Sequence, residues 1–303
     1  MAIYICVPTY RERSFVESFL ASLRITSEKI VVVIVNSCPQ DETTKLINNF
    51  RTPPPHHEIV EIFGDESEYW ASAVQRALDY VNKIAQVHDF ICLMNIDVCI
   101  TNDVFKRLRD AWGTGKYAFL AAVLHNNGTI ISSGTKVRSW FWTLNAHPLM
   151  HMNLSEVNAG ELPEIDYAPA RCVFFSVHHY RLAGPIKHKC LPHYGADSEF
   201  TLRLSRRTSL SGAILPSATV EVNTKNTGMS VYGDRQNIYR RIRQLFHIKN
   251  PSNPIYRSRF IYLSYPRYSI FTSLVFYSLR SVLDCLGISR FVREKFPCLK
   301  ISH

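Results

Sequence analysis

The sequence predicts an α/β fold, with a mostly parallel central sheet flanked by helices and a helical C-terminal extension. Apolar, β-branched runs alternate with helical patterns through the first half of the 303-residue chain, as a parallel sheet with crossover helices requires. Hydrophobic residues make up 46% of the chain, which is enough for one large core. The basic surplus is confined to the last quarter, so we expect two regions, residues 1–230 and 231–303.

The first hundred residues are predicted to form four strands with helices between them. Strands are expected at 2–7, 30–35, 58–62 and 90–94, and helices at 12–24, 41–50 and 71–84. The run IVVVIV at 30–35 is too rich in β-branched residues to favour a helix. Pro8 is expected to end the first strand, and the prolines at 53–55 stop the second helix.

The next hundred residues continue the pattern less regularly. A helix is expected at 103–112 and a strand at 118–124. Asn127-Gly128 favours a tight turn into a strand at 129–132. Residues 137–169 are rich in Trp, His and Pro and are expected to be irregular. A strand at 172–177 and an amphipathic helix at 197–206 complete this region.

Polar residues gather where the predicted elements meet. Residues 8–10 (Pro8, Thr9 and Tyr10) follow the first strand, residues 36–41 the second, and residues 95–97 the fourth. Two acids, Asp197 and Glu199, open the late helix. Ligands of parallel sheets bind beyond the carboxyl ends of the strands. We therefore expect the chemistry of this protein at these loops.

In this order, the segments resemble the family 2 glycosyltransferases of the GT-A fold, especially bacterial branches that build surface polysaccharides of the O-antigen or capsule type. The resemblance covers roughly residues 2–230. It rests on these segments: Val7-Pro8-Thr9-Tyr10, Asn36 to Asp41, the helix start from Tyr69-Trp70 to Gln75, Asn95-Ile96-Asp97-Val98, and Gly195 to Arg203. The segment at 95–98 is similar to the metal-binding DxD motif, and the segment at 195–203 to the region that supplies the base.

The resemblance implies inverting transfer of a sugar from a nucleoside diphosphate donor to a hydroxyl of a saccharide or lipid-linked acceptor. Asp97 would hold a divalent cation, Mn²⁺ or Mg²⁺, because such cations bind hard oxygen ligands and offset pyrophosphate charge. Asp197 would be the general base, since an acid is favoured at a helix start. The donor would contact Pro8, Thr9, Tyr10, Asn36, Asp41, Trp70, Asn95 and Glu199.

Two departures from the family pattern affect the cation. Asn95 stands at the first DxD position, which leaves one carboxylate there. The family often adds a His after the base helix, and residues 223–230 contain none. Asn226 could replace it, or Lys225 could neutralise the phosphates directly. Without the other motifs, Asp97 could also cap a turn and Asp197 a helix, with Asn36 and Asp41 as ordinary loop residues.

Two other functions remain open from the sequence. A nucleotidyltransferase of related fold also uses strand-end acids and a cation, but no glycine-rich phosphate loop with a following Lys lies near the first strand. A non-catalytic protein that binds a membrane or nucleic acid is the second alternative. No nucleic-acid-binding module is recognisable, so we do not expect nucleic acid as a partner. Trp70 is expected to line the site, and Trp140 and Trp142 could stack on a sugar or pack in the core.

The last quarter of the chain predicts contact with an anionic surface. Residues 235–303 hold 13 Lys and Arg against two acids, a surplus of +11. The uncharged run at 268–279 is shorter than the roughly 20 residues of a spanning helix. As a helix it would place these residues on one face: Phe271, Leu274, Val275, Leu279, Val282, Leu283 and Leu286. This face would lie on an anionic membrane, or pack on the same chain or on a second subunit.

The compartment is predicted from two further features. The N-terminal residues lack the basic region of a signal peptide. The eight cysteines show no CxxC spacing and several lie in apolar runs, which favours buried free thiols over disulfides or zinc ligands. We therefore expect a cytoplasmic protein, in peripheral contact with the inner face of the plasma membrane if the basic segment binds there.

Overall fold

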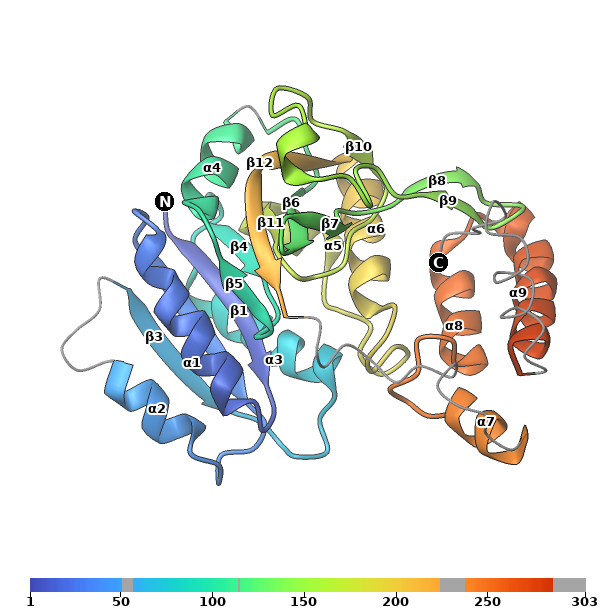
Figure 1. Cartoon of the computed structure of the whole chain (residues 1–303), viewed down its shortest axis with the longest axis horizontal. Coiled ribbons are helices and arrows are strands. Elements are labelled where there is room, and N and C mark those ends of the chain that lie inside the picture. Colours follow the sequence, from blue (N-terminus) through green and yellow to red (C-terminus); the bar gives the residue numbers. More distant parts are fainter. Residues whose placement is uncertain (51–56, 114, 224–237, 286–303) are drawn as a thin grey trace.

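A computed structural model describes residues 1–50, 57–113, 115–223 and 238–285, and its elements are labelled in Figure 1. The described strands form one large sheet in the order β10-β12-β6-β11-β4-β1-β2-β3, with β5 beside β12 and β7 beside β6. The strands of this sheet are β1 (Ile3–Thr9), β2 (Ile30–Asn36), β3 (Glu58–Phe63), β4 (Phe90–Leu93), β5 (Val98–Ile100), β6 (Leu120–Asn126), β7 (Thr129–Ser132), β10 (Glu164–Ile165), β11 (Val173–Ser176) and β12 (Gly212–Val222).

Most of the long strand pairs are parallel. β1 runs parallel to both β2 and β4, β2 to β3, and β6 to β12. β11 is antiparallel to its neighbours β4 and β6, and thus joins the two parallel halves of the sheet. The prediction of a mostly parallel sheet flanked by helices is confirmed.

Helices flank the sheet (Figure 1). They are α1 (Arg13–Ser22), α2 (Thr43–Phe50), α3 (Trp70–Ile84), α4 (Val104–Trp112), α5 (Val177–Ala183) and α6 (Ala196–Thr208), followed by α7 (Ile238–Leu245), α8 (Pro254–Ser264) and α9 (Ile270–Cys285). Each of α1 to α4 lies within the range that its apolar spacing predicts, or within one residue of it. The buried side of α3, for example, carries Val74, Ala77, Leu78 and Val81, at the helical spacing that covers a sheet.

The first strand continues through Pro8, contrary to the prediction that it ends there. Pro8 pairs in register with Val35, and Thr9 with Asn36. On the other side of β1, pairing with β4 stops at Cys6, and the next bond in that direction goes from Met94 N–H to Cys6 O. Proline is tolerated where a neighbouring strand has ended, since no ladder bond is lost there.

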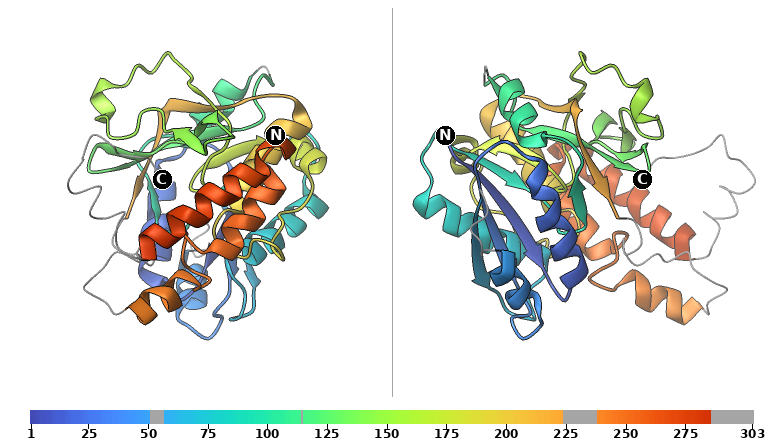
Figure 2. Two further views of the ribbon diagram at one scale, coloured as in Figure 1. Left: turned by 90° about the vertical axis from the view of Figure 1, so that its right-hand side faces the viewer. Right: turned by 60° about the vertical axis from the view of Figure 1, so that its left-hand side comes forward.

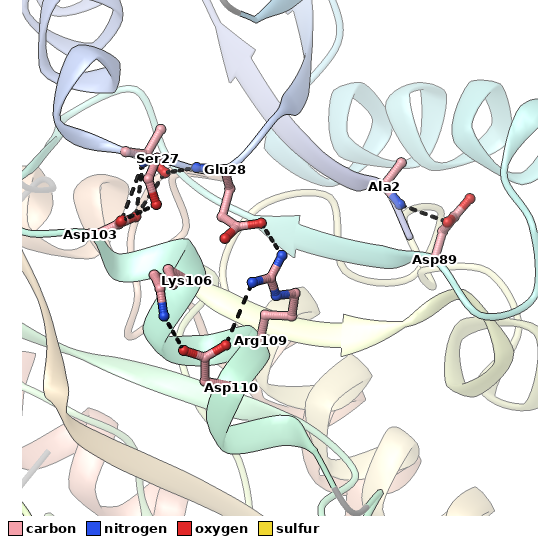
Figure 3. Close-up of polar contacts among 9 residues, drawn as sticks. Ala2, Ser27, Glu28, Asp89, Asp103, Lys106, Arg109 and Asp110 are labelled. Carbon is pink, nitrogen blue, oxygen red and sulfur yellow. Dashed lines mark hydrogen bonds and ion pairs between the residues drawn. The ribbon is translucent and has the colours of Figure 1, made fainter.

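Polar contacts close the amino ends of the strands, at the edge away from the polar loops (Figure 3). The Ala2 N–H donates to Asp89 Oδ1 at 2.8 Å, which ties the start of β1 to the start of β4. Asp103, just before α4, accepts bonds from Ser27 just before β2. Arg109 on α4 pairs with Glu28. These contacts hold one edge of the sheet, and leave the opposite edge for a ligand.

Several elements were not predicted. β12 and α5 lie in segments where only coil or strand was expected, and β5 follows Asp97 directly. The stretch expected to be irregular contains a small hairpin of β8 (Lys136–Ser139) and β9 (Leu144–Ala146) besides β10. β12 carries a register shift between Leu215 and Thr219, and this bulge accommodates Pro216 within a central strand.

The C-terminal helices pack on the sheet domain (Figure 2). Phe260, Ile261 and Tyr265, in and just after α8, belong to the same hydrophobic core as the strands. Arg206 on α6 also donates to the carbonyl oxygen of Ser264 at the end of α8. The predicted region boundary near residue 230 falls within 224–237, outside the described residues. None of the helices in the described part of the chain has the length and apolarity needed to span a membrane.

Candidate functional site

A cavity of about 650 Å³ opens beyond the carboxyl ends of β1 and β4. Its walls come from the loops after these strands, the start of α3, the start of α6 and one residue of the α7–α8 loop. The lining residues include Pro8, Thr9, Tyr10, Glu12, Tyr69, Trp70, Asn95, Asp97, Arg171, His193, Tyr194, Asp197 and Lys249. The predicted location of the site at this edge of the sheet is therefore where the structure has its cavity.

Asp97 lies between β4 and β5 and reaches into the cavity. Its side chain is 16% exposed, and its Oδ2 lies 3.3 Å from the Arg171 guanidinium. Burial raises the pKa of Asp97, while the charge of Arg171 opposes that rise. The other carboxylate oxygen, Oδ1, is buried and has no hydrogen-bond partner among the described residues. One lone pair of Asp97 is thus available to a ligand.

Two further cavity residues have buried polar atoms without a partner in the described part of the chain. They are Thr9 Oγ1, at the end of β1, and His193 Nδ1, before α6. Buried polar atoms in proteins are normally hydrogen-bonded. Because burial is the largest influence on it, the pKa of His193 falls to about 4, so its imidazole is neutral at physiological pH. With Asp97 Oδ1, these atoms offer both donors and acceptors to a polar ligand.

Asp197 stands in the first turn of α6. Gly195 takes the left-handed conformation (φ 82°) and the helix begins at Ala196, so Asp197 is the second helical residue and not its N-cap. Its Oδ1 accepts from Ser198 N–H at 2.8 Å, and its Oδ2 from Ala170 N–H at 3.3 Å. Burial raises the pKa of Asp197, and these two bonds and the charge of Arg171 oppose that rise. The carboxylate is held in place, and a proton is easier to add than to an exposed aspartate.

Trp70 and Asn95 are joined at the cavity wall. The Trp70 indole N–H donates to Asn95 Oδ1 at 2.8 Å, which links the start of α3 to the loop after β4. The amide oxygen of Asn95 is therefore occupied by the indole. Both residues line the cavity, as predicted. Trp140 and Trp142, which could also have stacked on a sugar, lie elsewhere: Trp140 packs against Tyr265, and Trp142 against Phe276.

Asn36 and Asp41 do not line the cavity. Asn36 is fully buried, donates to Glu61 at 3.0 Å and accepts from Cys38 N–H at 3.0 Å. Asp41 accepts from Thr43 N–H at 2.9 Å, next to the start of α2. Both side chains shape the loop after β2, whose Ser37 does reach the cavity. A direct contact of either side chain with the donor stays a prediction.

Glu199 faces away from the cavity. It is 4% exposed, and its two oxygens accept from Arg203 Nε at 2.8 Å and Nη2 at 2.9 Å, one helical turn later. Arg203 also donates to the carbonyl of Pro185. These bonds connect α6 to the segment after α5 and give Glu199 a structural role. Its contact with the donor stays a prediction.

Replacing Glu199 by alanine should lower the free energy of unfolding by about 3 kcal/mol, because Arg203 would remain buried without its partner. Chemical denaturation of both proteins would measure the loss. Activity per folded molecule should be retained at low temperature. A stable but inactive Glu199→Ala protein would contradict this structural role and return Glu199 to the site.

Sequence reasoning missed several cavity residues. Arg171, Glu12, His193 and Lys249 come from four separate segments, and no spacing relates them. The sequence offers one indication of His193, because it lies four residues before the predicted base Asp197. Burial raises the pKa of Asp97, Tyr194 and Asp197, and the charge of Arg171 opposes that rise in all three. It is the positive charge that the three side chains share.

The donor set fits a divalent cation that uses few protein ligands. No group of three His, Cys, Asp or Glu side chains in the described residues could hold a metal by itself. Asp97 Oδ1, however, is a buried oxygen without a partner inside the cavity. Mg²⁺ sites commonly combine one or two carboxylates with phosphate oxygens and water. The stretch that holds Lys225 and Asn226 lies outside the described residues.

Solved structures resemble this chain in fold. S. aureus TarS gives a TM-score of 0.58 at 12% identity, over 94% of this chain and 54% of that one. The mannosyltransferase PcManGT from Pyrobaculum calidifontis, solved with GDP-Man and Mn²⁺, gives 0.56 at 12% identity over 95% and 74%. GalNAc-T7, solved with UDP, GalNAc and Mn²⁺, gives 0.56 at 10% identity over 98% and 58%. The predicted GT-A fold is confirmed.

The sequence itself identifies the family. No curated protein matches the chain, and it spans 60% and 54% of two TarS structures that it resembles. The family model described as glycosyl transferase family 2 matches residues 4–159, which is just over half of the 303 residues. The chain belongs to glycosyl transferase family 2.

Proposed function

We propose that this protein transfers a sugar from a nucleoside diphosphate donor to an acceptor hydroxyl, with inversion at the anomeric carbon. One observation carries the proposal: two carboxylates, Asp97 and Asp197, line the same cavity, and the charge of Arg171 acts on both. Two acids in one site are what a diphosphate-sugar transfer needs, one toward the leaving group and one toward the nucleophile.

Asp97 serves the leaving group. Its unpartnered Oδ1 would hold the divalent cation, which when bound offsets the negative charge of the diphosphate. The ion pair with Arg171 keeps the carboxylate in place and adds a positive charge beside it. Thr9 Oγ1, also unpartnered, would donate to the donor, and the Trp70–Asn95 pair would form an adjoining wall of the pocket.

Asp197 serves the nucleophile. As the acceptor oxygen attacks the anomeric carbon, its proton passes to the Asp197 carboxylate while the bond from that carbon to the diphosphate breaks. A single displacement of this kind inverts the configuration. The raised pKa of Asp197 suits the role, since a stronger base takes the proton more readily. His193, neutral in the same cavity, would orient sugar hydroxyls.

Calorimetry tests the donor proposal directly. UDP, GDP, CDP and ADP are titrated into the protein with Mg²⁺ or Mn²⁺, followed by a thermal-shift screen of the corresponding nucleotide sugars. We expect one nucleobase to bind and its sugar derivatives to stabilise the fold. Family 2 membership favours glycosyl over nucleotidyl transfer, and release of free pyrophosphate from a nucleoside triphosphate would reverse that preference.

We further propose that the acceptor belongs to bacterial surface-polysaccharide synthesis, as a saccharide or a lipid-linked hydroxyl at the inner face of the plasma membrane. An exposed apolar stripe on α9 supports the membrane contact. Phe271, Val275, Leu279 and Val282 are between 50% and 77% exposed, at the spacing of one helix face. Leu274, predicted on the same face, packs against the core, and Leu286 lies outside the described residues.

The tip of the β8–β9 hairpin extends this stripe. Phe141, Trp142 and Leu144 are all exposed, and the Trp142 ring lies 5.1 Å from that of Phe276 on α9. The hairpin reaches toward α9 at one end of the molecule (Figure 1), and α9 runs across that end face in the left view of Figure 2. Apolar side chains from two separate elements thus share one end.

The charge around this end favours an anionic lipid surface over a second copy of the chain. Residues 238–283 contain eight Lys and Arg and no acid. Two such faces brought together would repel each other, whereas an anionic bilayer attracts basic segments and takes up apolar side chains. Nucleic acid would leave the apolar stripe in water.

The double substitution Phe271→Asp and Leu279→Asp should abolish binding to anionic vesicles at low salt. Vesicles of phosphatidylglycerol and phosphatidylcholine, sedimented with the protein, give the measurement, and pure phosphatidylcholine gives the neutral comparison. Wild-type binding should weaken as salt rises, because the Debye length shortens to about 3 Å at 1 M. Removal of the whole extension is a poorer test, since α8 fills part of the core.

The matched control is Ile84→Asp with Val87→Asp, which adds the same charges at exposed apolar positions near the end of α3. It should bind anionic vesicles nearly as well as the wild type. Any small decrease would reflect the lower net positive charge that both double substitutions share. If the wild type ignores anionic vesicles at low salt, the membrane proposal is wrong. Concentration-dependent sedimentation would then identify the stripe as an oligomer interface.

A further inference from the structure

The loop between α7 and α8 brings a cation of the C-terminal extension into the cavity. Lys249 is one of the lining residues, together with Thr9, Asp97 and Asp197. Its Nζ lies 5.8 Å from the centre of the ring of Tyr10, the residue that directly follows β1. The extension therefore takes part in the site, although its sequence predicts a separate surface.

Two buried asparagines fix this loop. Asn250 Nδ2 donates to Gln244 O at 2.9 Å, and its Oδ1 accepts from Ser252 N–H at 2.8 Å. Asn253 Nδ2 donates to Phe246 O at 2.9 Å, while its Oδ1 accepts from Ile255 N–H at 3.0 Å and caps α8. Both side chains are almost completely buried. The backbone on either side of Lys249 is thus held by side-chain bonds, and the ammonium is carried to a defined place.

The cavity is acidic, and its other cation is already paired. Glu12, Glu66, Glu68, Asp97 and Asp197 line it, against Arg171 and Lys249. Arg171 forms an ion pair with Asp97. Within the residues that the structure describes, the Lys249 ammonium has no carboxylate partner at ion-pair distance. Burial raises the pKa of Glu12, and the charge of Lys249 opposes that rise. Burial lowers the pKa of His193, and the charge of Lys249 adds to that fall. The charge of Asp97 also acts on Glu12, so Glu12 lies near both Asp97 and Lys249.

We propose that Lys249 binds the diphosphate of the donor, in the cavity that Asp97 also lines, as a compact point charge supplied by the C-terminal extension. This inference rests on the proposed donor and adds a residue to its site. An ammonium near developing negative charge on the leaving group stabilises it. Asp97 is the one carboxylate at the predicted cation position. A lysine in the same cavity adds a positive charge near the diphosphate that does not depend on the cation.

The test is the binding of UDP and GDP, and of UMP and GMP, to wild type and Lys249→Gln by calorimetry in Mg²⁺. The nucleotide that the wild type binds is used for the comparison. Affinity for the diphosphate should fall about tenfold in Lys249→Gln, since a hydrogen bond to a charged group is of that size. Affinity for the monophosphate should change much less. Lys249→Arg should recover most of the loss, because it keeps the charge.

Arg267→Gln is the matched control. It removes one positive charge from an exposed position of the same extension, outside the cavity, and should leave both affinities unchanged. If the wild type binds UDP or GDP and Lys249→Gln binds it equally well, the assignment of Lys249 is wrong while the proposed function stands. If the wild type binds neither UDP nor GDP, CDP and ADP with their monophosphates replace them in the same comparison. If none of the four diphosphates binds, the proposed donor falls, and the role of Lys249 with it.

Discussion

Replacement of Asp197 by asparagine is expected to reduce turnover by about 10²–10⁴-fold, the usual contribution of a general base. Asparagine keeps the size of the side chain, and its single oxygen can still accept one of the two bonds that Asp197 accepts from Ala170 and Ser198, but it cannot take the acceptor proton. Donor binding should stay near normal, because Asp197 faces the nucleophile. NMR coupling constants of the wild-type product should show an anomeric configuration opposite to that of the donor.

The pH dependence gives a second measurement of the same residue. Burial raises the pKa of Asp197, so the acid limb of the rate profile should lie above the ordinary aspartate value of 3.8. The same shift makes the ionised carboxylate destabilising in the folded protein. The stability of Asp197→Asn relative to the wild type should therefore be greatest near pH 7, and should decrease as the pH falls through the raised pKa to 3.8.

These results separate chemistry from folding. A retained anomeric configuration would exclude the inverting mechanism. An Asp197→Asn protein of normal activity would move the base to another cavity acid, and Glu12 would be the next to test. Glu199 would be a poor candidate, since Arg203 occupies both of its oxygens.

Replacement of Asp97 by alanine is expected to abolish measurable turnover while the protein still folds. The side chain lies at a strand end, and its ion pair with Arg171, the only one it forms among the described residues, is partly exposed. Its removal takes away the carboxylate oxygen that would hold the cation, so Mg²⁺ or Mn²⁺ should no longer strengthen the binding of nucleoside diphosphate. Calorimetry with and without the cation measures this coupling, and circular dichroism checks the fold.

Asp103→Ala is the matched control for Asp97→Ala. Asp103 also follows a strand and precedes a helix, but it contacts Thr26 and Ser27 at the opposite edge of the sheet (Figure 3). Its loss should reduce stability without changing the response to the cation. Full wild-type activity in excess EDTA, or an active Asp97→Ala protein, would show that the cation or Asp97 has no part in the reaction.

Local sequence patterns predict the first half of the fold because they are strong there. The IVVVIV run becomes β2 almost residue for residue, and α3 follows its apolar spacing. β12 escaped prediction because Pro216 interrupts its pattern, and only the pairing with β6 and β5 makes it a strand. α5 escaped because the apolar run before it favours a strand beyond Ser176, whose hydroxyl instead accepts from His179 N–H and caps the helix.

The site divides in the same way. Thr9, Trp70, Asn95, Asp97 and Asp197 were predicted because they stand at the ends of recognisable elements, and all line the cavity. Asn36 and Glu199 were predicted from similar positions, yet their side chains turn to Glu61 and Arg203. Position along the chain indicates which loops approach a site. It does not indicate which way a side chain turns, nor that Lys249 will meet Tyr10, 239 residues earlier, at the end of the first strand.

The late position of β12 in the chain has a consequence for protein synthesis. β6 ends at Asn126, whereas its parallel partner begins at Gly212, so more than eighty residues must be added before that edge of β6 is covered. At about 5–20 residues per second, the delay is on the order of five to fifteen seconds. During that time the nascent chain carries an open, apolar strand edge of the kind that recruits other chains. We expect the yield of soluble protein to depend on chaperones that bind such segments as they leave the ribosome.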